Sequence, residues 1–143
     1  MNLVGYLNRK LKDDAVIGLL EHYDMEVIYE FDRLHENTAD AYSSAAKDAG
    51  FELRFNEQQV LETIWCYVKE RDGFMAVDSG ILGVPCYSSF AEAVNSVEAR
   101  HLRLSKPSAG SEAWIRMEEK SIWRHYEFLD GELALLTLML PWE

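Results

Sequence analysis

Residues 124–140 read RHYEFLDGELALLTLML, which is a strand-like run, a Leu129-Asp130-Gly131 turn and a second, more apolar run. Residues 51–68 read FELRFNEQQVLETIWCYV and have the same layout with a slightly longer turn. In the first run of each stretch, apolar residues alternate with polar ones, which is typical of a strand with one solvated face. Each stretch therefore predicts an antiparallel β-hairpin.

The two hairpins are separated by a nearly constant number of residues. Phe128 follows Phe55 by 73 residues, and Leu133 follows Leu61 by 72 because the second turn is one residue shorter. A repeated spacing of this kind indicates that the two halves of the chain share one structural plan.

A helical pattern precedes each hairpin at a similar distance. Leu20 lies 35 residues before Phe55, and Val94 lies 34 residues before Phe128. We therefore predict an α+β fold of two tandem units, each a helix followed by an antiparallel meander, which form one sheet with the helices on one face. Residues 1–143 would make a single domain of two pseudo-repeats, at about 1–78 and 79–143.

The expected secondary structure follows from hydrophobic spacing and from turn residues. Helices are predicted at 3–11, 15–22 and 90–97, with Asp13 or Asp14 capping the second and Ser88 or Ser89 capping the third. The alanines of residues 42–50 favour a helix, whereas the repeat register favours a strand, which we predict. Further strands are expected at 25–32, 51–55, 60–68 (central), 74–77 (edge), 101–104, 113–118, 122–128 and 133–140.

The composition is that of a folded protein, with 48% hydrophobic and 27% charged residues. No apolar run approaches the roughly 20 residues that cross a bilayer. The first residues lack a basic region followed by an apolar core, so we expect no signal peptide and a cytoplasmic location.

The formal net charge of −11 is distributed unevenly. Residues 13–40 contain nine Asp and Glu residues and a single basic residue, Arg33, which gives this segment a net charge of −8. Such a segment repels nucleic acid and attracts a basic protein partner. The alternative is that the acidic surface serves solubility alone.

No motif for catalysis, phosphate binding or metal binding occurs in the chain. The four histidines are scattered, and His125 is interpreted as a structural residue of its strand. Cys66 and Cys86 lack the spacing of a metal site, and Cys66 lies in an apolar run that predicts a buried, inert thiol. We therefore expect no enzymatic activity, no cofactor and no metal.

The aromatic residues indicate a binding surface instead. Trp65 shares a strand face with Tyr67, and Trp123 shares one with His125, because alternate residues of a strand point to the same side. If these faces point away from the helices, the sheet offers a rigid aromatic surface edged by carboxylates, of the kind enriched at protein interfaces. The alternative is that the aromatics fill the core, which we expect for about half of them.

Several stretches resemble small immunity proteins of bacterial polymorphic-toxin systems. They are Gly50–Phe55, Leu61–Tyr67, Leu82-Gly83-Val84-Pro85 before Ser88 and the helix Ala91–Val97, Trp114-Ile115-Arg116, and Tyr126–Leu138. The layout is also similar to the tandem α/β repeats of β-lactamase-inhibitor-like domains, another set of binding proteins. The resemblance spans residues 13–140 and implies a protein that binds and neutralises a toxin domain.

The sequence therefore predicts a non-enzymatic cytoplasmic immunity protein that occludes the active cleft of a cognate toxin, with a nuclease fitting the charge best. The alternatives are an adaptor or self-assembling scaffold of the α+β class, and a small-ligand or enzymatic domain with a pocket between helices and sheet. No nucleic-acid or membrane partner is expected, and a homodimer is left open. The candidate partner-binding residues are Asp24, Glu26, Glu30, Asp32, Glu36, Asp40, Trp65, Tyr67, Trp114 and Trp123.

Overall fold

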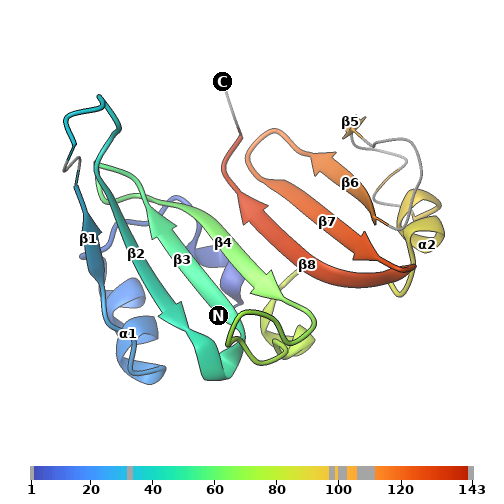
Figure 1. The fold of residues 1–143 in the computed structure, drawn as a ribbon, viewed down its shortest axis with the longest axis horizontal. Coiled ribbons are helices and arrows are strands. Elements are labelled where there is room, and N and C mark those ends of the chain that lie inside the picture. Colours follow the sequence, from blue (N-terminus) through green and yellow to red (C-terminus); the bar gives the residue numbers. More distant parts are fainter. Residues whose placement is uncertain (1, 32–33, 97–98, 100–102, 106–111, 142–143) are drawn as a thin grey trace.

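Eight antiparallel strands form one continuous sheet in the computed structural model, in the order β1-β2-β3-β4-β8-β7-β6-β5 (Figure 1). The structure describes residues 2–31, 34–96, 99, 103–105 and 112–141. The strands are β1 (Ile28–Glu30), β2 (Ala41–Ala46), β3 (Phe51–Phe55), β4 (Leu61–Tyr67), β5 (Arg103–Ser105), β6 (Glu112–Glu118), β7 (Trp123–Leu129) and β8 (Glu132–Met139). The α-helices are α1 (Asp14–His22) and α2 (Phe90–Val94), and the 3₁₀ helices are η1 (Leu3–Tyr6), η2 (Lys47–Ala49) and η3 (Ser79–Ile81).

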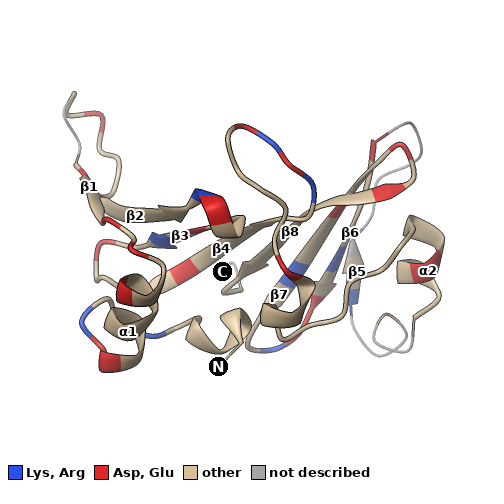
Figure 2. Ribbon diagram, turned by 90° about the horizontal axis from the view of Figure 1, so that it is seen from below, with Lys and Arg blue, Asp and Glu red and all other residues tan. Residues whose placement is uncertain are grey.

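The two α-helices lie on one side of the sheet (Figure 2). The strand residues that face them are buried and apolar, and β4 and β8 form the centre, where Ile64 pairs with Leu138 and Cys66 with Leu136. The alternation seen in the sequence therefore places one set of side chains in the core and the other set on the opposite, helix-free face. We refer to that second surface as the open face.

A buried polar cluster fixes the connector before α2 to the sheet. Tyr126 on β7 donates a hydrogen bond from its hydroxyl to the carbonyl oxygen of Pro85, at 2.7 Å. The guanidinium of Arg124, which is also buried, donates to the same hydroxyl at 3.2 Å and lies 3.8 Å from the carboxylate of Glu119. Burial is tolerated because each of these groups has a partner.

The antiparallel hairpins and the strand character of residues 42–50 are confirmed. That stretch forms β2 and ends in η2, where Gly50 adopts a left-handed conformation (φ 80°). Ser89 caps α2 by accepting a hydrogen bond from the backbone N–H of Glu92, as predicted. Residue 97 of the predicted helix and residues 101–102 of a predicted strand lie outside the described residues.

The predicted helix at residues 3–11 is wrong beyond its first turn, which is η1. After η1 the backbone pairs instead with the first residue of β4 and with the segment before it: Asn8 donates to the carbonyl of Leu61, and Leu11 donates to that of Gln59. Because these backbone groups are used in tertiary pairing, they cannot also form helical hydrogen bonds.

The predicted edge strand at residues 74–77 is also wrong. Arg71 and Phe74 exchange backbone hydrogen bonds across a tight turn, and the following residues then bond to two different parts of the chain. Met75 donates to Lys47 of η2, and Val77 donates to Tyr67 at the end of β4. The segment is a loop that packs against the end of the sheet.

Within the described part of the chain, no helix is long and apolar enough to cross a membrane.

Candidate protein-binding face

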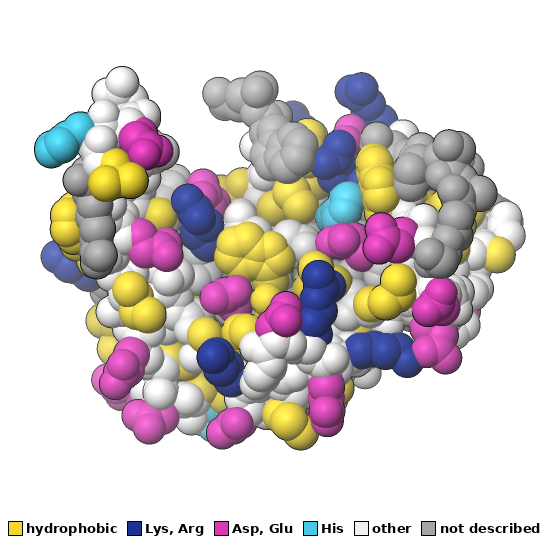
Figure 3. All heavy atoms as spheres, in the orientation of Figure 1, with side chains coloured by type: hydrophobic (Ala, Val, Ile, Leu, Met, Phe, Trp, Pro, Cys, Tyr) yellow, Lys and Arg dark blue, Asp and Glu magenta, His cyan; other side chains and the backbone are white. Residues whose placement is uncertain are grey.

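The open face of the sheet carries rows of aromatic, cationic and carboxylate side chains. Residues paired across neighbouring antiparallel strands point to the same side, so the strand register defines these rows. Figure 3 looks onto the open face, where hydrophobic side chains lie at the centre with acidic and basic groups around them.

The middle row crosses five strands. It consists of Glu52 on β3, Trp65 on β4, Thr137 on β8, His125 on β7 and Arg116 on β6, each paired with the next. Thr137 is only 6% exposed although it lies on the open face, since it stands between two larger neighbours in the row. The row is therefore a continuous surface rather than a set of isolated side chains.

Two flanking rows run parallel to it. One consists of Tyr67, Leu135, Glu127 and Trp114, and the other consists of Arg54, Thr63, Met139, Trp123 and Glu118. The four predicted aromatic residues Trp65, Tyr67, Trp114 and Trp123 thus lie on the same helix-free face, and all four are half-buried. β4 and β6 are separated by three strand spacings, or about 14 Å, a span that one protein partner covers readily.

Arg116 lies at the centre of the aromatic group on β6 and β7. Its guanidinium carbon is 5.5 Å from the ring centroid of Trp114 and 5.0 Å from that of Trp123. Its Nε also lies 3.1 Å from the carboxylate of Glu118, which in turn lies 3.3 Å from Arg103 on β5. Stacking and ion pairing together hold the tryptophan rings in fixed positions.

His125 is held neutral within this group. Its ring lies 5.0 Å from that of Trp114, and its Nδ1 is buried without a hydrogen-bond partner in the described structure. Burial, with a smaller contribution from the positive charge of Arg116, lowers the pKa of His125 to about 4. The imidazole is therefore uncharged at neutral pH and acts as a polar aromatic surface.

This low pKa predicts a pH-dependent stability. The unfolded chain binds a proton at His125 near pH 6.5, whereas the folded chain binds it only near pH 4, so the free energy of unfolding should fall as pH falls through this window. His125→Phe keeps a ring against Trp114 but cannot take up the proton. Denaturation at pH 7 and pH 4.5 should show a smaller loss of stability in the variant than in the wild type. Equal losses in the two proteins would contradict the assignment.

The loop after β4 covers one end of the open face. Phe74 is buried there, and its ring stacks on that of Tyr67 with a centroid distance of 4.1 Å, while the amine of Lys47 lies 5.8 Å from the Phe74 ring. The hydroxyl of Tyr67 donates to the carboxylate of Glu52 at 3.4 Å. Of the four aromatic residues predicted to bind a partner, Tyr67 is therefore the one whose ring contributes most clearly to the packing of the fold itself.

Beside this loop the open face is hollowed into a pocket of about 770 Å³. Its walls include Trp114, Glu127, Arg71 and the ion pair between Lys69 and Glu132. Burial raises the pKa of Glu127, and the nearby Arg71 opposes that shift. The mixed charges of this wall favour polar contacts with a partner's side chain over the binding of an apolar ligand.

The predicted acidic residues lie apart from the aromatic group. Glu26, Glu30 and Glu36 are exposed around β1, at the far end of the sheet, and Asp40 accepts a hydrogen bond from the hydroxyl of Tyr29 at 2.6 Å. Asp32 lies outside the described residues. Figure 2 shows acidic residues on α1 and on the connections around β1. The two sets of predicted residues are therefore about 14 Å apart or more, three strand spacings from β1 to β4.

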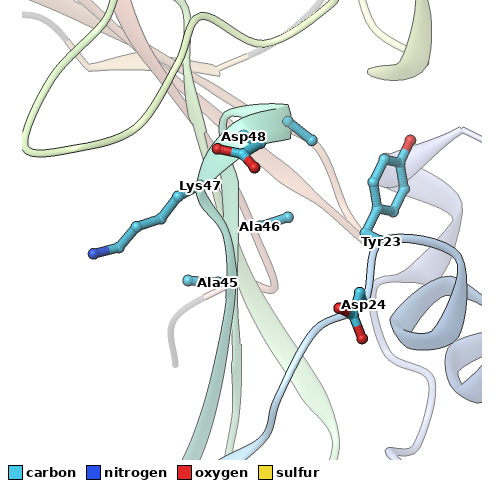
Figure 4. A pocket seen from close by; sticks show the side chains of 7 residues that line it. Tyr23, Asp24, Ala45, Ala46, Lys47 and Asp48 are labelled. Atoms are coloured by element: carbon cyan, nitrogen blue, oxygen red, sulfur yellow. The ribbon is translucent and has the colours of Figure 1, made fainter.

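Asp24 belongs to a different surface. It follows α1 and lines a pocket of about 570 Å³ with Tyr23 and the turn after β2. Figure 4 shows Tyr23 and Asp24 on one side of this pocket and Ala46 and Asp48 on the other, with Lys47 pointing away from it. The Tyr23 ring packs edge-on against Phe51 in the core, so this wall is part of the fold.

Two groups of residues were missed by the sequence reasoning. Arg116 was not singled out, although it alternates with Trp114 and Glu118 on one strand, a period-2 pattern that predicts a shared face. Five large hydrophobic residues around β1 are exposed, and no sequence pattern distinguished them from core residues; they are Val27, Ile28, Tyr29, Phe31 and Leu34.

No group on the open face has the geometry of a catalytic nucleophile paired with a base in the residues described. Cys66 is a free thiol in the core, where burial raises its pKa and so disfavours the reactive thiolate. Among the described residues, no group of three or more His, Cys, Asp and Glu side chains could hold a metal ion. The chemistry that the face offers is stacking, hydrogen bonding and ion pairing.

Comparison of the chain with protein-family models, with curated proteins and with solved structures found no match. The function is therefore inferred from the geometry of the open face and of the strand at its acidic end.

Proposed function

We propose that this chain is a non-enzymatic binding protein that uses the open face of its sheet to hold a protein partner. More specifically, we infer an immunity protein of the cytoplasm that neutralises a cognate toxin domain by covering its active cleft. The resemblance to polymorphic-toxin immunity proteins supports this second step.

The observation that carries the proposal is the row arrangement on the open face. Trp65, Trp114 and Trp123 are half-buried, fixed by their strands and separated by the polar groups His125 and Arg116. Rigid aromatic residues bury a large area at a low cost in conformational entropy, which makes them frequent anchors of protein interfaces. A sheet face built in this way, without a covering layer of helices, is suited to a partner of similar size.

The charge distribution supports a basic partner. The segment 13–40 contributes −8 of the net charge, and its described carboxylates Glu26, Glu30 and Glu36 are exposed. An acidic surface accelerates association with a basic one and opposes non-specific binding to nucleic acid. A nuclease has a basic cleft, so an acidic protein that fills this cleft would exclude the nucleic-acid substrate.

We also infer that the chain consists of two copies of one plan. A helix followed by four strands occurs twice in the element order. In the sheet, β1 to β4 run in order from one edge to the centre, and β5 to β8 run in order from the other edge to the centre, where β4 pairs with β8. An approximate twofold axis normal to the sheet would relate the two halves. The acidic segment then belongs to one half and the Trp114–Arg116–Trp123 group to the other.

Substitution of the central tryptophans tests the proposal. We expect Trp65→Ala and Trp123→Ala each to weaken binding of the toxin domain by at least about 2 kcal/mol, or roughly 30-fold, because buried aromatic anchors dominate interface energies. The measurement is the dissociation constant, by calorimetry, for the C-terminal domain of a toxin encoded beside this gene. Inhibition of the toxin's activity should weaken in parallel.

The control is Ile17→Ala, which removes an exposed hydrophobic side chain from α1, on the opposite side of the sheet. This variant should bind as the wild type does. If the wild-type chain does not hold the toxin domain even at low salt, the immunity proposal is wrong. If it holds a non-toxin protein through Trp65 and Trp123 instead, the alternative of an adaptor domain is correct.

A further inference from the structure

β1 ends the sheet at the side opposite β5, and no other strand of the described chain pairs with its outer edge. An uncovered edge presents backbone N–H and C=O groups that can pair with a strand from another chain. Proteins usually protect such an edge with lysine, proline or a covering loop. β1 has neither lysine nor proline, since its residues are Ile28, Tyr29 and Glu30, and its single charged residue is acidic.

The side chains around this edge are apolar and exposed to an unusual degree. Ile28 is 60% exposed, Phe31 is 51% exposed and Leu34 is 76% exposed. Five of the eight large hydrophobic residues that are exposed in the described structure lie between residues 27 and 34. Such a concentration beside an unpaired edge marks a surface that a partner covers.

β1 is nevertheless held firmly in place. The Tyr29 ring stacks on that of Tyr42 with a centroid distance of 5.0 Å, and its hydroxyl donates to Asp40. The carbonyl oxygen of Glu26 accepts a hydrogen bond of 2.6 Å from the hydroxyl of Ser44. The edge is therefore pre-organised, which lowers the entropic cost of adding another strand.

We propose that β1 accepts an extended segment of a basic protein partner as a ninth strand of the sheet. Backbone hydrogen bonds to residues 28–30 would provide affinity. Glu30 would face a lysine or arginine of the added strand, and Tyr29 would face an apolar residue, because directly opposed side chains interact across antiparallel strands. The identity of the partner rests on the proposed function, whereas the strand pairing does not.

Charge selects this occupant over the alternatives. A second copy of the chain would bring its acidic segment, with a net charge of −8, against the same segment of the first copy, and this repulsion opposes pairing. A basic segment is attracted by the same charges. β5, at the other end of the sheet, carries Arg103 in place of an acidic residue; this side chain is 86% exposed and paired with Glu118, so the edge attracts a basic strand less than β1 does.

A synthetic peptide of seven alternating valines and lysines tests the pairing without any toxin. We expect it to bind at low salt and to protect from hydrogen exchange those backbone amides of residues 28–30 that point away from β2. The same peptide N-methylated at its central residues keeps the charge but loses its backbone donors, and it should bind at least about tenfold more weakly.

Two variants of the chain make the test specific to β1. Ile28→Lys changes an exposed side chain and places a cation on the edge, so it should weaken peptide binding about tenfold. Glu21→Lys makes a charge-reversing substitution within the same acidic segment, on α1 and away from the edge, and should change binding by less than about threefold.

Three results would overturn the inference. They are equal binding of the two peptides, protection of amides away from β1, and a concentration-dependent dimer of the chain that Ile28→Lys dissociates, which would make a second copy the occupant. Because the assay uses only a peptide, it can succeed while binding of a toxin fails, and the reverse is also observable. The failure of this inference and that of the proposed function are therefore distinguishable.

Discussion

Gly50→Ala is expected to lower the free energy of unfolding by about 3 kcal/mol or more, through backbone strain and overpacking together. Gly50 has a φ of 80°, in the left-handed region that other residues rarely adopt. A methyl group at this position would lie 2.4 Å from the carbonyl oxygen of Met75 and 2.6 Å from the backbone nitrogen of Val77. Both atoms belong to the backbone of the loop over β4, so the clash cannot be relieved by a rotamer change.

Gly131 provides the matched control. Its φ of 84° is nearly the same, but an added methyl group would meet no atom within 4 Å. Gly131→Ala should therefore cost about 1–2 kcal/mol, from the left-handed conformation alone. Urea denaturation followed by tryptophan fluorescence would measure both variants. Equal losses of stability would show that the loop at residues 74–77 is not packed against Gly50 as described.

Phe51→Ala should destabilise the fold by about 3–5 kcal/mol, the range measured for large-to-small changes of buried phenylalanines. Phe51 is completely buried on β3, where it faces the helices between Ala46 and Cys66, and its ring contacts that of Tyr23 edge-on at 5.1 Å. Removing the ring would leave a cavity between β3 and the end of α1. The midpoint of thermal unfolding should fall by roughly 10–17 °C.

The neighbouring residue on the same strand is the control for this prediction. Glu52 points to the open face, and from the described residues it accepts only the 3.4 Å hydrogen bond of Tyr67. Glu52→Ala should therefore cost less than about 1 kcal/mol. A comparable loss of stability in the two variants would contradict the assignment of Phe51 to the buried face and of Glu52 to the open face.

The sequence predicted these two faces only as a pair of alternatives. The alternation of Phe51, Leu53 and Phe55 with Glu52 and Arg54 indicated which residues share a side. It could not indicate which side the helices cover at β4 and β8, because both sides of these strands are apolar or aromatic. The side that the helices cover is decided by contacts between segments far apart in the chain, such as the hydrogen bond from Val4 to the carbonyl of Leu82.

The loop at residues 74–77 and the segment at residues 8–11 show the same limit. Their local sequences are compatible with a strand and a helix, respectively. In the folded chain their backbone groups pair instead with η2, with the end of β4 and with the segment before it. Tertiary hydrogen bonds therefore overrode local propensity in both places.

The candidate site was predictable only in part. Period-2 alternation placed Trp65 with Tyr67 and Trp123 with His125, and the structure brings these two pairs onto one face. The exposure of the residues around β1 was not predictable, because an end strand has a neighbour on one side only, and position in the sheet is not encoded in a three-residue strand. The acidic residues and the tryptophans were predicted to contact the same partner, and the structure separates the two sets by three strand spacings.

By itself the sequence determined the local geometry of each hairpin. Asp130 and Gly131 both have positive φ values, of 51° and 84°, and two consecutive residues of this kind favour the tight turn that joins β7 to β8. Only the tertiary structure decided that β4 pairs with β8 and that the helices lie on a single side. That pairing joins strands about 70 residues apart, and its energy comes from burying both strands against the rest of the chain, a quantity that no short stretch of sequence contains.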